Sequence, residues 1–310
     1  MTFDIVGERQ VSSIGELHAA LHLAMQLEFS TIPPYLCAQW SITEDPDRVE
    51  GILHAIVSQE MQHFALAGNV LNALGGRPQI ACAGFLPGYP IESLPGGVQL
   101  SKPLYLAPLT AAQVELFMEI EHPAFPPVAL AAATATIGTF YERIITAIQN
   151  LKPAFDPASH QMKIPLLPRI TNAQEAIAAL QRIKQEGEGT AVSPDQPADE
   201  RDIFAHYYMF KEVLLGRCLI KVNRDWCFEG DVIRMPTVCT FQQGPSTSIH
   251  ALQFRRLLSD LLRELEACWI LGAPYGVASM FRLGQQGRYL VRQGITPPFE
   301  WIDSLDASES

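Results

Sequence analysis

The stretch ILHAIVSQEMQHFALAGNVLNAL, from Ile52 to Leu74, has the spacing of a helix and carries Glu60 and His63 three residues apart. At about 100° per residue its apolar side chains form a narrow stripe that includes His63, with Glu60 at the edge. Both polar side chains therefore face the expected core, where a carboxylate is costly unless something pairs with it. A metal ion held by the Glu-x-x-His step is one solution. A hydrogen-bonded polar pair is the other.

A second inward carboxylate is predicted in the helix that precedes this stretch. Ser13 and Glu16 form a capping-box pattern at its start, and Leu17, Leu21, Ala24 and Glu28 then follow at helical spacing. Glu28 therefore faces inward by the same reasoning as Glu60. The prolines at 33 and 34 predict a kink or a rewound turn shortly after it.

The segment from Arg77 to Thr110 is rich in proline and glycine and fits neither the helical nor the strand period. Four-helix bundles tolerate one long crossover between their second and third helices, although such loops are otherwise uncommon in compact domains. We therefore expect residues 77–110 to form that crossover. Tyr89 and Tyr105 within it are expected to shape a substrate pocket over one end of the bundle.

The third bundle helix is predicted over Pro127 to Asn150, a nearly continuous apolar run that Glu142 interrupts. Glu142 is interpreted either as an inward ligand or as a surface partner of the neighbouring arginine. A short helix, 111–121, precedes it and contains a second Glu-x-x-His step, Glu119 with His122. Because a proline follows His122, these two side chains need not share a helix face.

The fourth bundle helix is predicted in two pieces, 172–189 and 202–216, with Glu188 at the end of the first and His206 early in the second. His206 adjoins an apolar stripe, so it is either a hydrogen-bonded core histidine or a ligand. Two further helical runs, 250–271 and 276–291, lie beyond. The sequence thus predicts an all-α protein, with a four-helix bundle in residues 1–218. Residues 219–310 are expected to be a C-terminal extension whose two helices pack on it.

The composition predicts a globular protein with a large core, because 48% of the 310 residues are hydrophobic and 18% are charged. The net charge of −11 argues against nucleic acid and anionic membranes as partners. The six cysteines include no Cys-x-x-Cys pair, which favours a reducing compartment. With neither a secretory leader pattern nor a membrane-length apolar run, we expect a cytoplasmic protein. A small molecule is the expected partner, and homo-oligomer formation is left open.

The candidate ligands combine carboxylates and imidazoles, which suit two iron or manganese ions. Four carboxylates would balance the charge of two divalent cations and make their burial tolerable. Such a pair of ions, about 3.5 to 4 Å apart, can bind and reduce dioxygen or polarise a substrate. The predicted metal ligands are Glu28, Glu60, His63, Glu142, Glu188 and His206.

Five blocks in this order also resemble a known family: QLEFSTIPPYL (26–36), SQEMQHFALAGNVLNALGGRP (58–78), IGTFYERI (137–144), QEGEGT (185–190) and HYYMFKEV (206–213). They look like the ferritin-like domain of iminophenyl-pyruvate dimer synthases, enzymes of bisindole pigment assembly. The resemblance spans about residues 12–295 and implies a ferritin-like bundle with the same six metal ligands. The usual second Glu-x-x-His of ferritin-like proteins is absent as a contiguous motif, and in its place Glu188 and His206 would have to meet across an insertion. Phe29 stands where relatives commonly have histidine.

What the resemblance implies for function is a dimetal oxidoreductase that acts on a small aromatic or amino-acid-derived substrate. In pathway members the domain can be part of a much larger chain, so the reaction itself is carried over by analogy. Two alternatives are a metal-binding ferritin-like protein without substrate turnover and a metal-free structural relative. The sequence identifies no separate catalytic residues and no organic cofactor site.

Overall fold

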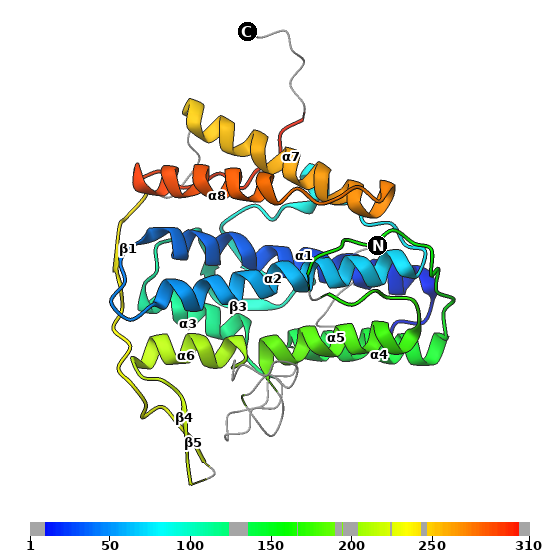
Figure 1. Ribbon diagram of the computed structural model, residues 1–310, viewed down its shortest axis with the longest axis horizontal. Helices are drawn as coiled ribbons and strands as arrows, with labels where there is room; N and C mark the ends of the chain where they lie inside the picture. The colour runs from blue at the N-terminus through cyan, green and yellow to red at the C-terminus, as the bar shows by residue number, and fades with distance from the viewer. Residues whose placement is uncertain are drawn as a thin grey trace.

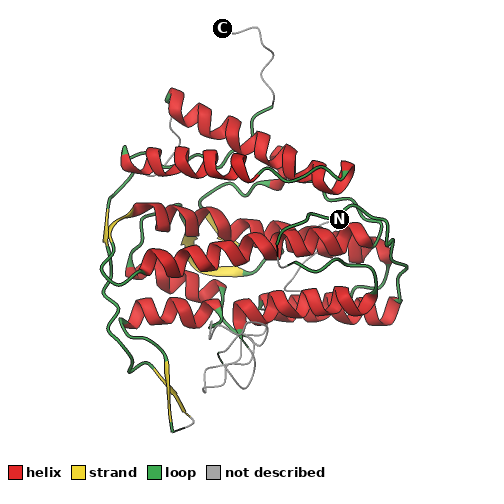
Figure 2. Ribbon diagram, in the orientation of Figure 1, coloured by secondary structure: helices red, strands yellow, loops and turns green. Residues whose placement is uncertain are grey.

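The computed structural model describes residues 10–123, 136–165, 167–189, 194, 204–223, 225–242 and 247–303. In this part of the chain the all-α prediction is confirmed, since helices dominate and the strands are short (Figure 2). The helices are α1 (Ile14–Ser41), α2 (Val49–Ala73), the 3-10 helix η1 (Ala83–Phe85), α3 (Ala111–Ile120), α4 (Ile137–Leu151), α5 (Ala173–Glu188), α6 (His206–Leu215), α7 (Ile249–Leu271) and α8 (Val277–Arg292).

The bundle is built from two long helices and two helices that are each broken near the middle. α1 packs along the whole of α2, while α3 pairs with α6 and α4 pairs with α5. α5 and α6 lie end to end in Figure 1 and together form the fourth bundle helix, as α3 and α4 form the third. The predicted helix 127–150 begins only at Ile137, and residues 124–135 lie outside the described residues.

Helix α1 continues through Pro33 and Pro34, where the sequence predicts a kink or a rewound turn. Pro34 has no N–H, so it leaves the carbonyl of Ser30 without its usual helical donor. The hydroxyl of Tyr89, from the crossover, donates a hydrogen bond to that carbonyl at 2.7 Å. A tertiary contact therefore satisfies the group that the proline leaves unpaired, and the helix does not end there.

The start and end of α2 are fixed by local hydrogen bonds. The carboxylate of Asp45 accepts from the backbone N–H groups of Val49 and Glu50, each at 2.8 Å, and so occupies donors that the first turn leaves free. Gly75 follows the helix with a φ of +79°, which only glycine adopts without strain. Gly75 thus provides a left-handed C-terminal cap for α2.

The crossover between α2 and α3 is more regular than its sequence indicates. It contains η1 and an antiparallel hairpin formed by β2 (Ile91–Ser93) and β3 (Gln99–Leu104). Two further antiparallel pairs lie elsewhere: β1 (Ile42–Glu44) with β6 (Thr237–Val238), and β4 (Ile220–Val222) with β5 (Asp225–Cys227). The irregular spacing of a short, twisted hairpin explains why no period was visible.

Helices α7 and α8 form a layer over the α1–α2 side of the bundle (Figure 1). Glycines allow the close approach: an added Cβ at Gly68 of α2 would lie 2.4 Å from the Trp269 ring of α7. Likewise, a Cβ at Gly287 of α8 would lie 2.2 Å from the ring of Trp40 in α1. Each tryptophan is buried, so the layer shares the core of the bundle.

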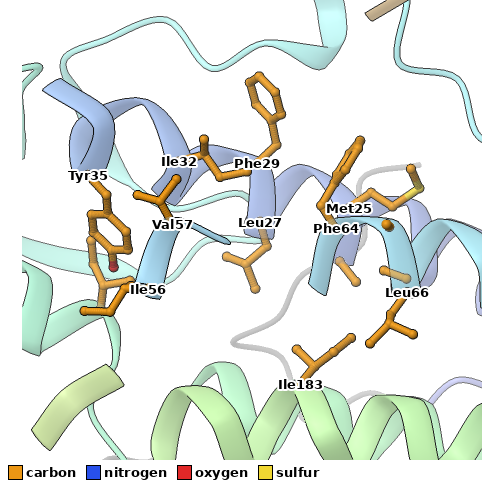
Figure 3. Close-up of a cluster of buried hydrophobic side chains, with 14 of the residues drawn as sticks. Met25, Leu27, Phe29, Ile32, Tyr35, Ile56, Val57, Phe64, Leu66 and Ile183 are labelled. Carbon is orange, nitrogen blue, oxygen red and sulfur yellow. The ribbon is translucent and has the colours of Figure 1, made fainter. Parts of the chain in front are cut away.

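The hydrophobic core lies between α1 and α2 and continues to both neighbouring layers. Figure 3 shows Leu27 of α1 pointing toward Ile183 of α5, whereas Phe29 points to the opposite side of α1. Phe29 packs edge-on against Phe64 and Phe85. Across the described residues, none of the helices combines the length and the apolar character that crossing a membrane requires.

Candidate metal centre

A cluster of buried acids and histidines lies at the level where the third and fourth bundle helices are broken. α1 supplies Glu28, and α2 supplies Glu60 and His63. The helix ends at the breaks supply three more side chains: Glu121 directly after α3, Glu188 at the end of α5 and His206 at the start of α6. All six are buried. The breaks thus place helix ends, and not only helix faces, at one side of the site.

The first half of the cluster joins Glu28, Glu60 and His63. One potential ligand atom from each lies within 4.8 Å of the others. The Nδ1 atom of His63 is 3.4 Å from Oε2 of Glu28 and 3.7 Å from Oε1 of Glu60. The three side chains predicted from helical spacing in the first two helices therefore converge on one point.

The second half joins Glu60, Glu121 and His206, again with one potential ligand atom of each within 4.8 Å of the others. The Nδ1 atom of His206 is 2.8 Å from Oε1 of Glu60 and 3.6 Å from Oε2 of Glu121. The approach to Glu60 lacks hydrogen-bond geometry, and Nδ1 has no hydrogen-bond partner among the described residues. Glu60 belongs to both halves, which is the arrangement of a carboxylate that bridges two ions.

The outer nitrogen of each histidine is already occupied. Nε2 of His63 lies 2.8 Å from Oε2 of Glu186, whose other oxygen accepts from Arg182 at 2.7 Å. Nε2 of His206 lies 3.0 Å from the side-chain oxygen of Gln59. Because Nε2–H is the donor to these acceptors, each ring turns its Nδ1 atom toward the carboxylates. Metal-binding histidines are oriented in this way in many proteins.

Hydroxyl groups hold three of the carboxylates. Tyr141 donates to Oε1 of Glu28, Tyr35 donates to Oε1 of Glu121 at 2.7 Å, and Thr31 donates to Oε2 of Glu60 at 2.9 Å. Burial and the nearby carboxylates raise the pKa of both tyrosines, so their hydroxyls remain protonated donors. In each acid one oxygen is therefore fixed by a neutral donor.

Glu188 is held by the start of α4. Its Oε1 accepts from the backbone N–H of Gly138 at 2.7 Å, and an added Cβ at Gly138 would lie 2.2 Å from Oε2. Only glycine leaves room for the carboxylate here. Glu188 also lines a small cavity that it shares with Glu28, Glu60, His63 and Glu121.

The protonation of the cluster reflects the crowding of acids in a buried place. Burial and the neighbouring Glu121 raise the pKa of Glu60 to about 7. Burial opposes the protonation of His206, but the carboxylates of Glu121 and Glu60 outweigh it and raise its pKa to about 9. Burial would also raise the pKa of Glu186, yet His63 and Arg182 prevail and lower it to about 2. Without a cation, the inner cluster therefore retains protons.

These donors fit two divalent ions. Glu28, Glu60, Glu121 and Glu188 offer four carboxylates, His63 and His206 offer two Nδ1 atoms, and Arg182 balances the charge of Glu186. Four carboxylates neutralise two divalent cations, which makes the burial of the filled site tolerable. Nδ1 of His206 lies 2.8 Å from Oε1 of Glu60 without hydrogen-bond geometry, and a hydrogen-bonded polar cluster does not explain this contact.

The structure brings together five of the six predicted ligands and leaves Glu142 outside. The side chain of Glu142 is 51% exposed and forms an ion pair with Lys184, so the prediction that it is a ligand is wrong. The buried face of α4 carries Tyr141 and Ile144 instead. Glu119 accepts from the backbone and hydroxyl of Ser101, and His122 stacks its ring edge-on with Tyr207 at 5.5 Å. The second Glu-x-x-His step is thus not a pair of ligands.

Sequence reasoning missed Glu121 and Glu186. Glu121 follows the last residue of α3, two positions before Pro123, and helical periodicity says nothing about a side chain beyond the last turn. Glu186 lies two residues before Glu188, near the end of the predicted helix 172–189. A cluster of acids at two predicted helix ends was the available signal.

Comparisons with known proteins agree with this architecture. A family model described as Ferritin-like matches residues 21–215, more than half of the chain, and the chain therefore belongs to the ferritin-like family. Among solved structures, it is similar to a ferritin-like protein from Caulobacter vibrioides. The two share 22% identity, with 94% of this chain and 100% of that chain covered and a TM-score of 0.70. At that identity the likeness shows the fold alone. No match was found among curated proteins.

Proposed function

We propose that this protein is a dimetal-carboxylate oxidoreductase. Glu28 and His63 would hold one divalent ion, Glu121 and His206 the other, and Glu60 would bridge them, with Glu188 completing the set. The observation that carries the proposal is the shared position of Glu60 in two convergent groups of ligand atoms. Oxygen and nitrogen donors of this kind suit iron first and manganese second.

When bound, a pair of such ions supplies dioxygen reduction or the polarisation of a substrate. The chain's own residues have defined tasks around that chemistry. Glu186 and Gln59 hold the two imidazoles in one tautomer, and Tyr141 and Tyr35 keep two of the acids oriented. Four apolar side chains, Leu27, Ile120, Ile137 and Ile183, line the cavity at the cluster and exclude bulk water.

The substrate class we propose is a small aromatic or amino-acid-derived molecule, as in the iminophenyl-pyruvate dimer synthases. The support is the resemblance of the five sequence blocks, which include Glu28, Glu60, His63, Glu188 and His206. The cavity at the cluster is about 20 Å³, which is room for about one water-sized molecule. An aromatic substrate therefore requires an opening beside the apolar wall, whereas dioxygen does not.

That small volume favours the second candidate function, a metal-binding ferritin-like protein without substrate turnover. Such a protein needs access only for ions, water and dioxygen. Of the two, we favour the oxidoreductase, because the outer hydrogen bonds fix both histidines and leave little freedom for ions to pass through the site.

Oxygen consumption by the ferrous protein separates the two functions. We expect aromatic 2-imino acids to accelerate uptake and to be consumed in proportion to it. Glu60→Gln should abolish this uptake, while Glu142→Gln, an exposed acid of the same type, should leave it unchanged. Uptake that is independent of any substrate would instead support the metal-binding protein.

We further propose a cytoplasmic location and a small molecule as the partner. All six cysteines are free in the described part of the chain, and one of them, Cys82, is exposed. Exposed thiols persist most readily in a reducing compartment. Labelling of Cys82 with a thiol reagent in freshly lysed cells tests the redox state directly.

A further inference from the structure

A second cavity, far larger than the one at the metal centre, lies between the crossover and the chain that follows α8. Its volume is about 310 Å³, within the range of small-molecule pockets. Its walls are formed by residues 88–90 and 105–106 of the crossover and by residues 296–300. Among the described residues, it shares no lining residue with the cavity at the cluster. It is therefore a separate site.

The walls of this cavity are apolar and aromatic. Tyr89 and Tyr105 line one side, and Pro297, Pro298 and Phe299 line the other. The two prolines and the phenylalanine are buried, so their surfaces are already fixed by packing. Flat, rigid walls of this kind recognise a planar ring with little loss of side-chain entropy.

Contacts behind the walls hold them in place. The ring of Phe299 stacks on Trp40 of α1 at 6.3 Å and meets Phe254 of α7 edge-on at 5.0 Å. The hydroxyl of Tyr89 is bound to the carbonyl of Ser30. The walls of the cavity are thus held by contacts with α1 and α7, and the cavity does not depend on a mobile loop closing over it.

The polar groups at the wall do not select an ion. Thr296 is 8% exposed, and its Oγ1 atom is enclosed by protein, so the hydroxyl is out of reach of a ligand in the cavity. At the edge, the carboxylate of Glu300 is paired with Arg255 at 2.8 Å. This ion pair leaves no net charge to select an ionic ligand.

We propose that this cavity binds one small, neutral aromatic molecule, with the ring between Tyr89, Tyr105 and the Pro297–Phe299 wall. The ligand does not touch the carboxylate cluster. Ser30, which holds Tyr89, and Thr31, which donates to Glu60, are consecutive residues of α1, but they serve different sites. The proposal therefore does not rest on the metal chemistry.

Calorimetry and saturation-transfer NMR with indole and 4-methylphenol test the assignment, with cyclohexanol as the non-aromatic control. The full chain is titrated with and without added Fe(II). We expect saturable 1:1 binding of both aromatics, with a Kd on the order of 0.1 mM, and binding of cyclohexanol at least about tenfold weaker. Glu60→Gln should bind indole as the unaltered protein does, whether or not oxygen chemistry is found.

One variant locates the site. Tyr105→Ala should weaken indole binding about tenfold. The matched control is Tyr289→Ala, because Tyr289 and Tyr105 are each 41% exposed and Tyr289 lies outside the cavity. Tyr105 is at the surface, so its removal should leave the melting temperature unchanged. The assignment fails if neither aromatic saturates, if cyclohexanol binds as tightly, or if Tyr105→Ala binds like the unaltered protein.

Discussion

Nε2 of His63 lies 2.8 Å from Oε2 of Glu186, and this contact decides which nitrogen of His63 faces the metal centre. Glu186 is in turn held by Arg182 on the same helix, one turn earlier. The guanidinium of Arg182, which lies outside the cluster, thus orients the imidazole of His63 inside it. The two contacts form a chain from the surface of α5 to Glu28 and Glu60.

Removing Arg182 should weaken metal binding without removing a ligand. Arg182→Met leaves Glu186 without its cationic partner, so His63 loses its fixed orientation, and we expect metal affinity to fall by about 10- to 100-fold. The matched control is Arg288→Met, since Arg288 pairs with Glu50 at the surface, away from the cluster, and such pairs contribute little. Competition titration with a chelator measures both affinities. Equal affinities in the two variants would contradict this role of Arg182.

The variants Glu121→Gln and Glu142→Gln should differ sharply in the amount of metal that they bind. Glu121 is buried in the cluster, so Glu121→Gln removes a charge and a ligand atom, and the metal bound per chain should fall from two ions to one or none. Glu142→Gln should retain both ions because that side chain faces solvent. Metal analysis after iron-replete expression gives the counts. Loss of metal in Glu142→Gln alone would reverse the assignment.

Gly138→Ala should displace Glu188. The new Cβ would lie 2.2 Å from Oε2 of Glu188, and the carboxylate cannot withdraw without losing the Gly138 N–H. We expect a loss of about 1–3 kcal/mol in unfolding free energy together with weaker metal binding. In contrast, nothing among the described residues lies within 4 Å of a Cβ at Gly51, so Gly51→Ala in α2 should be neutral or slightly stabilising. Urea denaturation and metal titration provide the measurements.

The metal-free protein should become less stable as the pH rises from about 5 to 9. The pKa of Glu60 rises from 4.5 to about 7 on folding, so between these values the folded state binds more protons and loses stability with rising pH. The pKa of His206 rises from 6.5 to about 9, and the stability that it contributes below 6.5 is lost across that interval.

Calorimetric melting temperatures of the chelated protein across this pH range measure the effect. With metal present the trend should reverse in sign, because binding requires deprotonated ligands and stabilises the folded state. A melting temperature of the metal-free protein that increases from pH 6 to pH 9 would show that these two groups do not dominate.

Gly68→Ala should loosen the C-terminal helices from the bundle. Its Cβ would meet the ring of Trp269, whose Nε1 donates to Asn69 at 2.8 Å. We expect destabilisation of about 1–3 kcal/mol. Unfolding in one cooperative transition, followed by both tryptophan fluorescence and circular dichroism, would show that the predicted 219–310 extension folds with the bundle. Two separate transitions in the unaltered protein would show that it does not.

The sequence was sufficient for the parts of the site that lie within continuous helices. Glu28, Glu60 and His63 follow from apolar stripes, because a helix fixes the direction of every side chain along it. Glu121 could not be found in this way. It lies one residue past the end of α3, where its direction depends on how the chain leaves the helix and packs against α6.

As with the site, the fold could be predicted from the sequence where local patterns determine it. The bundle, its crossover and the two C-terminal helices follow from periodicity and from glycine and proline positions. The uninterrupted course of α1 through its prolines did not follow, because the donor to the Ser30 carbonyl is Tyr89, 59 residues further along the chain.

The broken helices have an electrostatic consequence for the cluster. α4 and α6 both begin at the level of the acids, with Gly138 donating its N–H to Glu188 and His206 opening α6 beside Glu60 and Glu121. A helix N-terminus carries the equivalent of about half a positive charge from its aligned peptide dipoles. Unbroken helices would present only their sides to the cluster, and no helix N-terminus would face the acids. The two interruptions therefore let the backbone itself offset part of the anionic charge, before any ion arrives.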